Sequence, residues 1–250
     1  MIPLKSERDL EMMRASGRIL GRVMQQLRQC IKAGISTVEL DRLAGELILK
    51  EGGLPAFKGY KGFPANICVS VNEEVVHGIP SARKLAEGDI VSVDMGVNYE
   101  GYFSDAAITV GVGRIHPDLK KLIEVSRTAL SEGVKQARID NRIRDISQAI
   151  QGCVEKNGFS VVRQFVGHGI GINLHEEPEI PNFVNPRQNQ PLKSGMVLAI
   201  EPMVNLGEWE CEIMENGWTA VTRDGLPSAH FEETVAVTEN GPEILTPIDG

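Results

Sequence analysis

The chain has 250 residues, 42% of them apolar and 24% charged, so it can bury a sizeable core as one large domain or two small ones. Its net charge of −8 and sequence pI of about 5.3 argue against a nucleic-acid-binding surface, because phosphate neutralisation needs clustered Lys and Arg. No apolar run is long enough to cross a membrane, and the first residues lack the pattern of a secretory signal. The scattered cysteines, without a CxxC pair, predict reduced thiols in a cytoplasmic protein.

The N-terminal quarter predicts two amphipathic helices. Ser6 is expected to cap the first, in which apolar residues recur at helical spacing up to Gly34. Ser36 and Glu39 form a capping-box pattern that opens the second helix, which ends at Gly52-Gly53. Residues 55–76 then change to strand and loop character and lead to a turn at 77–80.

Residues 90–105, IVSVDMGVNYEGYFSD, predict a hairpin with a buried first strand and a turn at residues 98–101. A turn centred between Tyr99 and Glu100 places Asp94 directly opposite Asp105. Like charges that face each other across strands repel, and a divalent metal between the carboxylates would relieve the repulsion. The alternative is two solvated aspartates in a ribbon whose register is altered by a bulge.

The second half repeats the succession of helices and strands. Helices are expected from a His116-Pro117 start to about Arg138 and from about Asn141 to Gly158. Strand character returns at residues 159–166, a buried strand is expected at 196–200, and two short strands are expected between 218 and 237. Four prolines predict an irregular excursion over residues 176–194.

An internal repeat links the two halves. The stretch from Gly88 to Asp94 parallels the stretch from Gly195 to Glu201, since each has a Gly, an apolar strand and then an acid six residues on. A second strand bearing an acid follows in both cases, with Asp105 in the first half and Glu232 in the second. This pattern predicts a pseudo-twofold single domain with halves of about 1–112 and 113–250, whose acids meet at its centre. Coincidence is the alternative, because helix–strand alternation is common.

The strand carboxylates Asp94, Asp105, Glu201 and Glu232 together carry a charge that two divalent cations would neutralise. The imidazole candidate is His168, which lies between glycines that allow close approach of the backbone. His77 and His175 lie in loops beside the strands, where acid–base side chains or merely structural histidines are both found. His116 is expected at a helix start. His230 shares a strand face with Glu232, so it either supports the ligands or is exposed.

The motifs VDMG, FSDAA, GHGIG, AIEPM and HFEET, which contain Asp94, Asp105, His168, Glu201 and Glu232, resemble the methionine aminopeptidases. The stretches VNEEVVHGIP, with His77, and LHEEP, with His175, are similar as well, and the resemblance covers nearly the whole chain. It implies an α+β pita-bread fold, a pseudo-symmetric single domain with a curved antiparallel sheet and flanking helices. A chain that begins at the catalytic domain, and that lacks room for a helical insertion between residues 203 and 231, resembles the bacterial type I branch.

The resemblance also implies a ligand set for two divalent metal ions, which would be Co, Mn, Fe or Zn. Asp94 would chelate one ion, His168 and Glu201 the other, and Asp105 and Glu232 would bridge them. A hydroxide generated there would attack the first peptide carbonyl while a metal holds the free α-amine. Glu201 would in addition move a proton, and His77 and His175 would contact the substrate and stabilise the oxyanion.

A pocket for the methionine side chain is implied as well. An aromatic- and sulfur-lined slot suits a flexible thioether, and the alternative is that its residues are core. Leu174 and Phe57 depart from the expected Phe and Cys, which alters the expected pocket width. A monovalent cation is implied near Asn72, Val76 and Ser228. The residues expected to line the pocket are Tyr60, Phe63, Cys68, Leu174 and Trp218.

The function implied by the resemblance is removal of initiator methionine from nascent proteins with a small second residue. The enzyme would be a cytoplasmic monomer that meets nascent N-termini at the ribosome and that binds neither nucleic acid nor membrane. Two alternatives remain open. One is the Xaa-Pro branch of the same fold, whose members usually carry an extra N-terminal domain, and the other is a non-catalytic binding module, which would typically have lost ligands.

Overall fold

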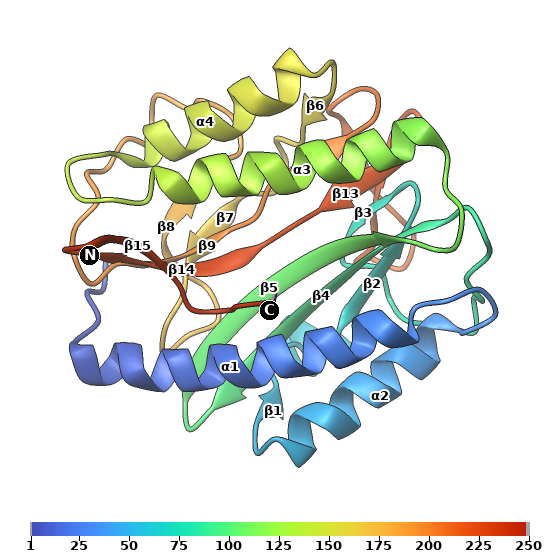
Figure 1. Cartoon of the computed structure of the whole chain (residues 1–250), viewed down its shortest axis with the longest axis horizontal. Helices are drawn as coiled ribbons and strands as arrows, with labels where there is room; N and C mark the ends of the chain where they lie inside the picture. The colour runs from blue at the N-terminus through green and yellow to red at the C-terminus, as the bar shows by residue number, and fades with distance from the viewer. Residues whose placement is uncertain (1, 249–250) are drawn as a thin grey trace.

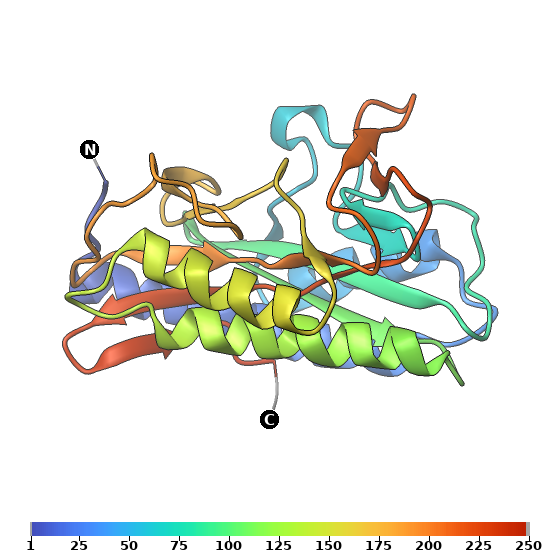
Figure 2. The same ribbon diagram turned by 90° about the horizontal axis from the view of Figure 1, so that it is seen from above.

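The computed structural model describes residues 2–248, which form an α+β fold with its helices gathered on one side of a curved, mostly antiparallel sheet system. In Figure 1 the helices α1 (Glu7–Cys30) and α2 (Thr37–Lys50) lie along one edge, and α3 (Pro117–Lys135) and α4 (Ile143–Lys156) lie along the other. Figure 2 shows that the loops around residues 57–63 and 206–227 rise from the opposite face. That face therefore remains open for a site.

Helix starts follow the local sequence chemistry. The Ser6 hydroxyl accepts from the backbone N–H of Asp9, and the Asp9 carboxylate accepts from the backbone N–H of Ser6, which is a complete capping box. Ser36 and Glu39 form the second expected box. His116 caps α3 through its ring, with Pro117 as the first helical residue. The predicted third and fourth helices extend beyond the observed ends by two or three residues.

The strands of the first half centre on the long hairpin of β4 and β5, and β1 and β2 pair with β4. Their bounds are β1 (Leu54–Pro55), β2 (Cys68–Val71), β3 (Glu74–Val76), β4 (Ile90–Tyr99) and β5 (Tyr102–Gly111), with a 3-10 turn η1 (Tyr60–Gly62) after β1.

In the second half, β9 and β10 together pair antiparallel with β13 and β14 in one continuous register. β7 and β8 extend this sheet on one side and β15 on the other. The bounds are β6 (Ser160–Val161), β7 (Gly167–Gly169), β8 (Glu176–Ile180), β9 (Val197–Ile200), β10 (Met203–Asn205), β11 (Cys211–Ile213), β12 (Ala220–Thr222), β13 (Ser228–His230), β14 (Glu233–Thr238) and β15 (Gly241–Ile244).

The expected pseudo-twofold symmetry is visible in strand pairing, and the division near residue 112 stays a prediction. β1 pairs with Val97 and Asn98 of the first hairpin, and β6 pairs with Val204 and Asn205 of the second, which are equivalent places. The two hairpins meet where Ala107 N–H donates to the Glu232 carbonyl at 3.3 Å and Glu232 N–H donates to the Ala107 carbonyl at 2.9 Å. We call this contact the seam.

Three predictions in the strands were wrong. The β4–β5 turn has Glu100 and Gly101 at its centre, both with positive φ, so Asp105 faces Gly96 and Asp94 faces Ala107. Residues 176–180 form β8, although prolines had predicted irregular chain over 176–194. Three strands, not two, lie between 218 and 238, because the strand carrying Glu232 breaks at the seam.

The main core lies between the helices and the sheet and contains the apolar faces of α1, α3 and the long hairpin. The helix α1 also receives the end of the described chain, since a Cβ on Gly17 would collide with the carbonyl oxygen of Leu245, and one on Gly21 with that of Pro247. Among residues 2–248, no helix is both long and apolar enough to cross a membrane.

Candidate metal centre

A cavity of about 200 Å³ opens on the face of the sheet opposite the helices. The five expected metal ligands, the two expected substrate histidines and all five expected pocket residues line it. Two other lining residues, Phe57 and Lys61, were not among the expected site residues, although Phe57 had been noted as a departure. Segments from both halves therefore converge on one site.

The carboxylates reach the cavity from the two hairpins. The two-residue shift in the β4–β5 register keeps Asp94 and Asp105 on the same face, because side chains alternate with a period of two. Glu201 follows β9, and its backbone carbonyl accepts from the side-chain amide of Asn182 at 3.0 Å. Glu232 lies at the seam, where its backbone pairs with Ala107. Asp105 and Glu232 are 3% and 2% exposed, so each carboxylate has lost nearly all of its hydration.

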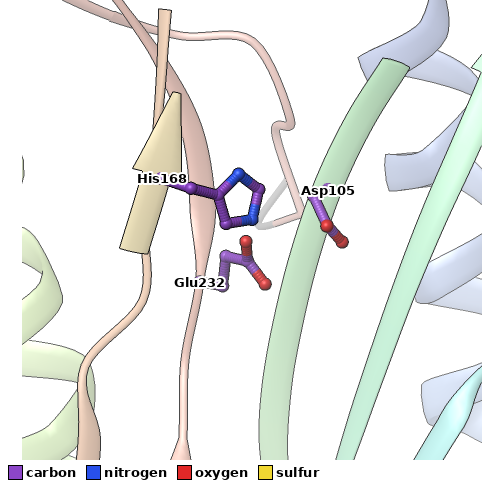
Figure 3. Close-up of side chains that lie close together, drawn as sticks. All are labelled: Asp105, His168 and Glu232. Carbon is purple, nitrogen blue, oxygen red and sulfur yellow. The ribbon is translucent and has the colours of Figure 1, made fainter. Parts of the chain in front are cut away.

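His168 comes from β7, and its glycine neighbours explain its position. A Cβ on Gly167 would meet the carbonyl oxygen of Ala199, and one on Gly169 would meet that of Glu177, so only glycine permits the strand spacing here. The Gly169 carbonyl lies 2.9 Å from His168 Nδ1, which makes Nδ1 the protonated nitrogen and leaves the lone pair on Nε2. In Figure 3 the His168 ring points toward the carboxylates of Asp105 and Glu232. Potential ligand atoms of these three residues all lie within 4.8 Å of one another.

Burial strongly disfavours the charged forms of these acids. It raises the pKa of Asp94 to about 7 and that of Glu201 to about 7, and it holds the pKa of Asp105 and Glu232 well above the usual range. Within the described part of the chain, one buried oxygen each of Asp94, Asp105 and Glu232 has no hydrogen-bond partner. Orphaned carboxylate oxygens beside an imidazole lone pair fit divalent cations, which would satisfy these oxygens and stabilise the ionised forms.

His230 is part of this cluster, which settles its position but not its role. It is 1% exposed, and its Nε2 lies 3.6 Å from Glu201 Oε2. The i, i+2 spacing from Glu232 correctly placed both side chains on one face. His116, by contrast, is an exposed helix cap, as expected.

His77 and His175 line the cavity from loops. Burial lowers the pKa of His77 to about 4 and that of His175 to about 3, so both rings are neutral at pH 7. His77 has a positive φ of 60°, and its ring meets Trp218 edge-on at 6.5 Å. His175 stacks between the rings of Tyr60, at 5.3 Å, and His168, at 4.0 Å.

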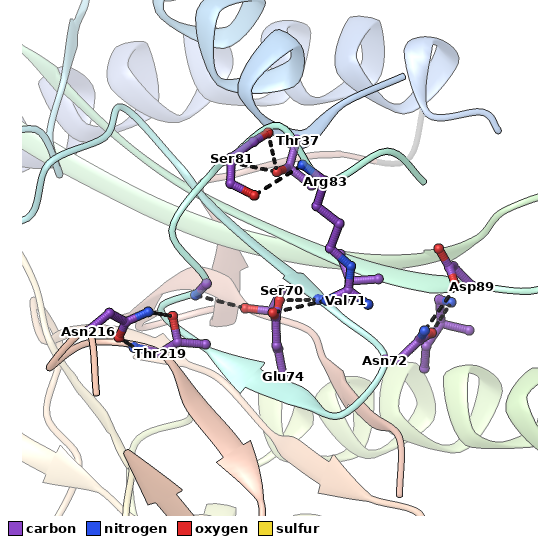
Figure 4. Close-up of polar contacts among 12 residues, drawn as sticks. Thr37, Ser70, Val71, Asn72, Glu74, Ser81, Arg83, Asp89, Asn216 and Thr219 are labelled. Atoms are coloured by element: carbon purple, nitrogen blue, oxygen red, sulfur yellow. Dashed lines mark hydrogen bonds and ion pairs between the residues drawn. The ribbon is translucent and has the colours of Figure 1, made fainter. Parts of the chain in front are cut away.

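Hydrogen bonds hold the loop of His77 in its left-handed conformation. Figure 4 shows three of the residues that take part, Ser70, Asn216 and Thr219. The residue after His77, Gly78, donates its N–H to the Ser70 hydroxyl at 3.1 Å, and the Thr219 hydroxyl donates to the His77 carbonyl at 3.3 Å. Asn216 donates to the Thr219 hydroxyl in turn, at 2.9 Å. The loop is therefore anchored from both halves of the chain.

A buried ion pair anchors the loop of His175. Lys5 Nζ lies 2.5 Å from Glu176 Oε2, with side-chain exposures of 7% and 3%. The other Glu176 oxygen accepts from the backbone N–H of Asn173 at 3.1 Å. The Glu176 carboxylate thus bridges Lys5 and the backbone of Asn173, and it fixes the short segment that carries Leu174 and His175.

The expected side-chain pocket forms the apolar wall of the cavity. Phe63 and Trp218 meet edge to face at 5.2 Å, and burial keeps the pKa of the Cys68 thiol well above its usual range, so the thiol remains neutral. The residues of this wall are Phe57, Tyr60, Phe63, Cys68, Leu174 and Trp218.

The residues expected to bind a monovalent cation lie outside this cavity. Ser228 N–H donates to the Asn72 carbonyl at 2.9 Å, and Val76 pairs with Ala220. The Asn72 side chain bridges Asp89 and the backbone N–H of Ile90. Asn72 and Ser228 are thus neighbours, and the cation itself stays a prediction.

Comparisons with known proteins agree with this geometry. The model of metallopeptidase family M24 matches residues 11–239. Methionine aminopeptidase from Clostridium perfringens is 53% identical, with 98% of this chain and 99% of that protein covered. Methionine aminopeptidase 1 from Bacillus subtilis is 51% identical, with the same coverage of both chains. The structure of methionine aminopeptidase from Thermotoga maritima superposes with a TM-score of 0.96 at 46% identity, covering 98% of this chain and 99% of that chain.

The relatives are about 50% identical over their full length, and the family model spans most of the chain. The similarity therefore lies in the sequence as well as in the fold. The pita-bread fold expected from the sequence is confirmed by the same comparisons. The chain belongs to metallopeptidase family M24 and, within it, to the methionine aminopeptidases of bacterial type.

Proposed function

We propose that the cavity binds two divalent metal ions and a peptide N-terminus, with a defined role for each lining residue. The chain is a metal-dependent aminopeptidase that removes the N-terminal initiator methionine from proteins with a small second residue. Asp94 would hold one ion, His168 and Glu201 the other, and Asp105 and Glu232 both. The observation that carries this assignment is the set of buried, unpartnered carboxylate oxygens that face the His168 lone pair.

When bound, such ions lower the pKa of water and polarise a scissile carbonyl. Glu201, a carboxylate that lines the cavity beside the other expected ligands, would take a proton from the attacking water and give it to the departing amine. His77 and His175 are neutral and each can donate one N–H to the substrate carbonyl oxygen, where negative charge develops. Their anchored loops keep these donors in place before the substrate arrives.

The apolar wall would receive the methionine side chain. Aromatic faces and the Cys68 thiol suit a polarisable thioether, and a cavity of about 200 Å³ limits the length of the side chain that can enter. Because Leu174 stands where Phe was expected and Phe57 where Cys was expected, the slot would be wider beside Leu174 and narrower beside Phe57 than the family pattern implies.

The finer assignments are also part of this proposal. The ions would be Co, Mn, Fe or Zn, and Asn72, Val76 and Ser228 would bind a monovalent cation. The enzyme would act as a cytoplasmic monomer on nascent N-termini at the ribosome.

The test is hydrolysis of Met-Ala-Ser and Ala-Pro-Ala by metal-free protein reconstituted with single metals. We expect release of methionine from Met-Ala-Ser, little cleavage of Ala-Pro-Ala, and loss of both metal binding and activity in Asp105→Asn. Full activity in that variant would contradict the ligand assignment. Preference for Ala-Pro-Ala would instead favour an Xaa-Pro enzyme, and the absence of any metal binding would favour a non-catalytic module.

A further inference from the structure

Glu201 is flanked by two imidazoles in the same way. His168 Nε2 lies 3.6 Å from Glu201 Oε1, and His230 Nε2 lies 3.6 Å from Glu201 Oε2. This spacing exceeds that of a hydrogen bond, about 2.7–3.2 Å. It matches two donors on one ion, since metal–ligand bonds of about 2.0–2.2 Å place neighbouring donors roughly 3–3.6 Å apart. The His230 imidazole therefore lies at the same distance from a Glu201 oxygen as the imidazole of the expected ligand His168.

Among residues 2–248, the Nε2 atom of His230 has no hydrogen-bond partner. It is buried without a hydrogen bond, on a side chain that is 1% exposed, and it faces the carboxylates. A neutral imidazole at this place can offer the lone pair of Nε2 to a metal ion. Potential ligand atoms of Glu201, His230 and Glu232 all lie within 4.8 Å of one another.

The pseudo-twofold relation across the seam makes His230 the counterpart of Asp105. Both residues lie two positions before the paired residues Ala107 and Glu232, on strands that run antiparallel. The same relation equates Thr109 with Thr234, each two positions after the seam residue of its own strand. A ligand position in the first half thus corresponds to His230 in the second.

The two threonines clamp these positions identically. Thr234 Oγ1 accepts from Asp105 N–H at 2.9 Å and donates to the Asp105 carbonyl at 2.8 Å. Thr109 Oγ1 accepts from His230 N–H at 2.9 Å and donates to the His230 carbonyl at 2.8 Å. The backbone under His230 is therefore fixed as firmly as the backbone under Asp105.

We propose that His230 is a sixth metal ligand, which binds through Nε2 beside Glu201 and Glu232. The proposal rests on the metal binding proposed above. A second imidazole makes the donor set less oxygen-rich, which favours borderline metals such as Co²⁺ over Mn²⁺. The structure thus assigns to His230 a part in metal selection as well as metal binding.

Titration calorimetry of the metal-free protein with Co²⁺ and with Mn²⁺ tests this selectivity. His230→Gln keeps a hydrogen-bond donor near Glu201 but removes the nitrogen ligand, so we expect Co²⁺ binding to weaken by about tenfold or more, as for other changes at metal sites, and Mn²⁺ binding by much less. His116→Gln, at the exposed cap of α3, is the matched control and should change neither. Equal weakening for both metals would reduce His230 to a positioning residue and overturn the proposal.

Proton NMR of the Co²⁺-loaded protein needs no variant. A ligating imidazole places its remaining N–H close to the paramagnetic ion, so we expect two strongly shifted, solvent-exchangeable resonances in the native protein, one from His168 and one from His230. A single such resonance would overturn the proposal even if His230→Gln failed to fold. A native protein that binds no Co²⁺ would overturn the proposed function itself, whereas normal binding with one resonance would remove only the sixth ligand.

Discussion

Burial sets the protonation state of the acids and of the two loop histidines in the cavity. The acids hold protons to near neutral pH, and His77 and His175 remain uncharged down to acidic pH. An uncharged imidazole can donate one hydrogen bond without repelling metal ions nearby. The two loop histidines are therefore suited to contact a substrate oxygen and unsuited to act as permanent cations.

His77→Ala should separate catalysis from metal binding. Loss of one oxyanion donor costs about 10²–10³ in rate, so kcat on Met-Ala-Ser should fall by that factor. Metal content, measured by elemental analysis, should be unchanged, because the ring lies outside the ligand clusters. His116→Ala serves as the control and should retain full activity. A variant that lost its metal would show that His77 is a ligand.

At the level of single residues, sequence motifs located the expected ligands and both loop histidines in one cavity. They did not indicate Lys61, because a single exposed lysine in a glycine-rich loop has no periodicity to place it, and its left-handed φ of 48° brings it to the cavity mouth. His230 was placed on the correct face by alternation. Its contact with Glu201 depends on the seam, which no local pattern encodes.

The helix α1 packs closely against the backbone at Leu245 and Pro247. Its glycines allow the backbone at Leu245 to touch the helix, and a side chain at Gly17 would collide with a carbonyl oxygen that cannot simply rotate away.

Gly17→Ala should therefore destabilise the protein by about 1–3 kcal/mol or more, the usual cost of overpacking. Gly152→Ala is the matched control, since Gly152 lies exposed in α4 with open space around its Cβ position. That change should stabilise by about 0.5–1 kcal/mol through helix propensity. Denaturant unfolding of both variants measures the contrast, and a neutral Gly17→Ala would contradict the packing described.

The loop between β7 and β8 depends on the Lys5–Glu176 ion pair. Lys5→Met leaves a buried carboxylate unpaired, which typically costs about 3–5 kcal/mol, and it should raise KM through movement of Leu174 and His175. The double variant Lys5→Met/Glu176→Met removes both charges, so its free energy of unfolding should return toward that of the native protein. Steady-state kinetics and denaturant unfolding test both effects. If the double variant were no more stable than Lys5→Met, the ion pair would not be the cause.

Helix positions followed from caps and periodicity, because those signals are local. The register of β4 and β5 could not be predicted in this way. The sequence is compatible with a turn centred on Glu100 and Gly101 and with one centred a residue earlier, and the positive φ angles of Glu100 and Gly101 select the first. β8 was missed for a different reason. β8 contains a proline, and a strand tolerates proline at the edge of a sheet, where it pairs with one neighbour only, here β7. The sequence alone does not show that this segment lies at an edge.

For the molecule as a whole, the raised pKa values of Asp94 and Glu201 couple stability to pH. In the unfolded chain these groups titrate near 3.8 and 4.5, and in the fold each titrates near 7, so the metal-free fold binds protons more tightly than the unfolded chain. Their favourable contribution is complete below about pH 4 and is lost as pH rises through about 7. Metal ions reverse this trend, since they bind the ionised carboxylates.

The melting temperature of the metal-free protein should therefore fall between pH 5.5 and pH 8, and the increase in melting temperature on adding Co²⁺ should grow over the same range. Differential scanning calorimetry at the two pH values, with and without metal, gives both quantities. Asp94→Asn should flatten the metal-free dependence, because it removes one of the titrating groups. A metal-free melting temperature that rose with pH would contradict the assigned shifts.

The contact between Gly17 and Leu245 joins nearly the first and the last described parts of the chain. During translation α1 is made more than two hundred residues before Leu245 and Pro247. The helix surface around Gly17 and Gly21 therefore lacks its native contact until those residues have been made. Glu232 likewise is among the last parts of the cavity to be synthesised. An enzyme that removes N-terminal methionine from other polypeptides can therefore complete its own helix packing and its own cavity only after residues 232–247 have been made.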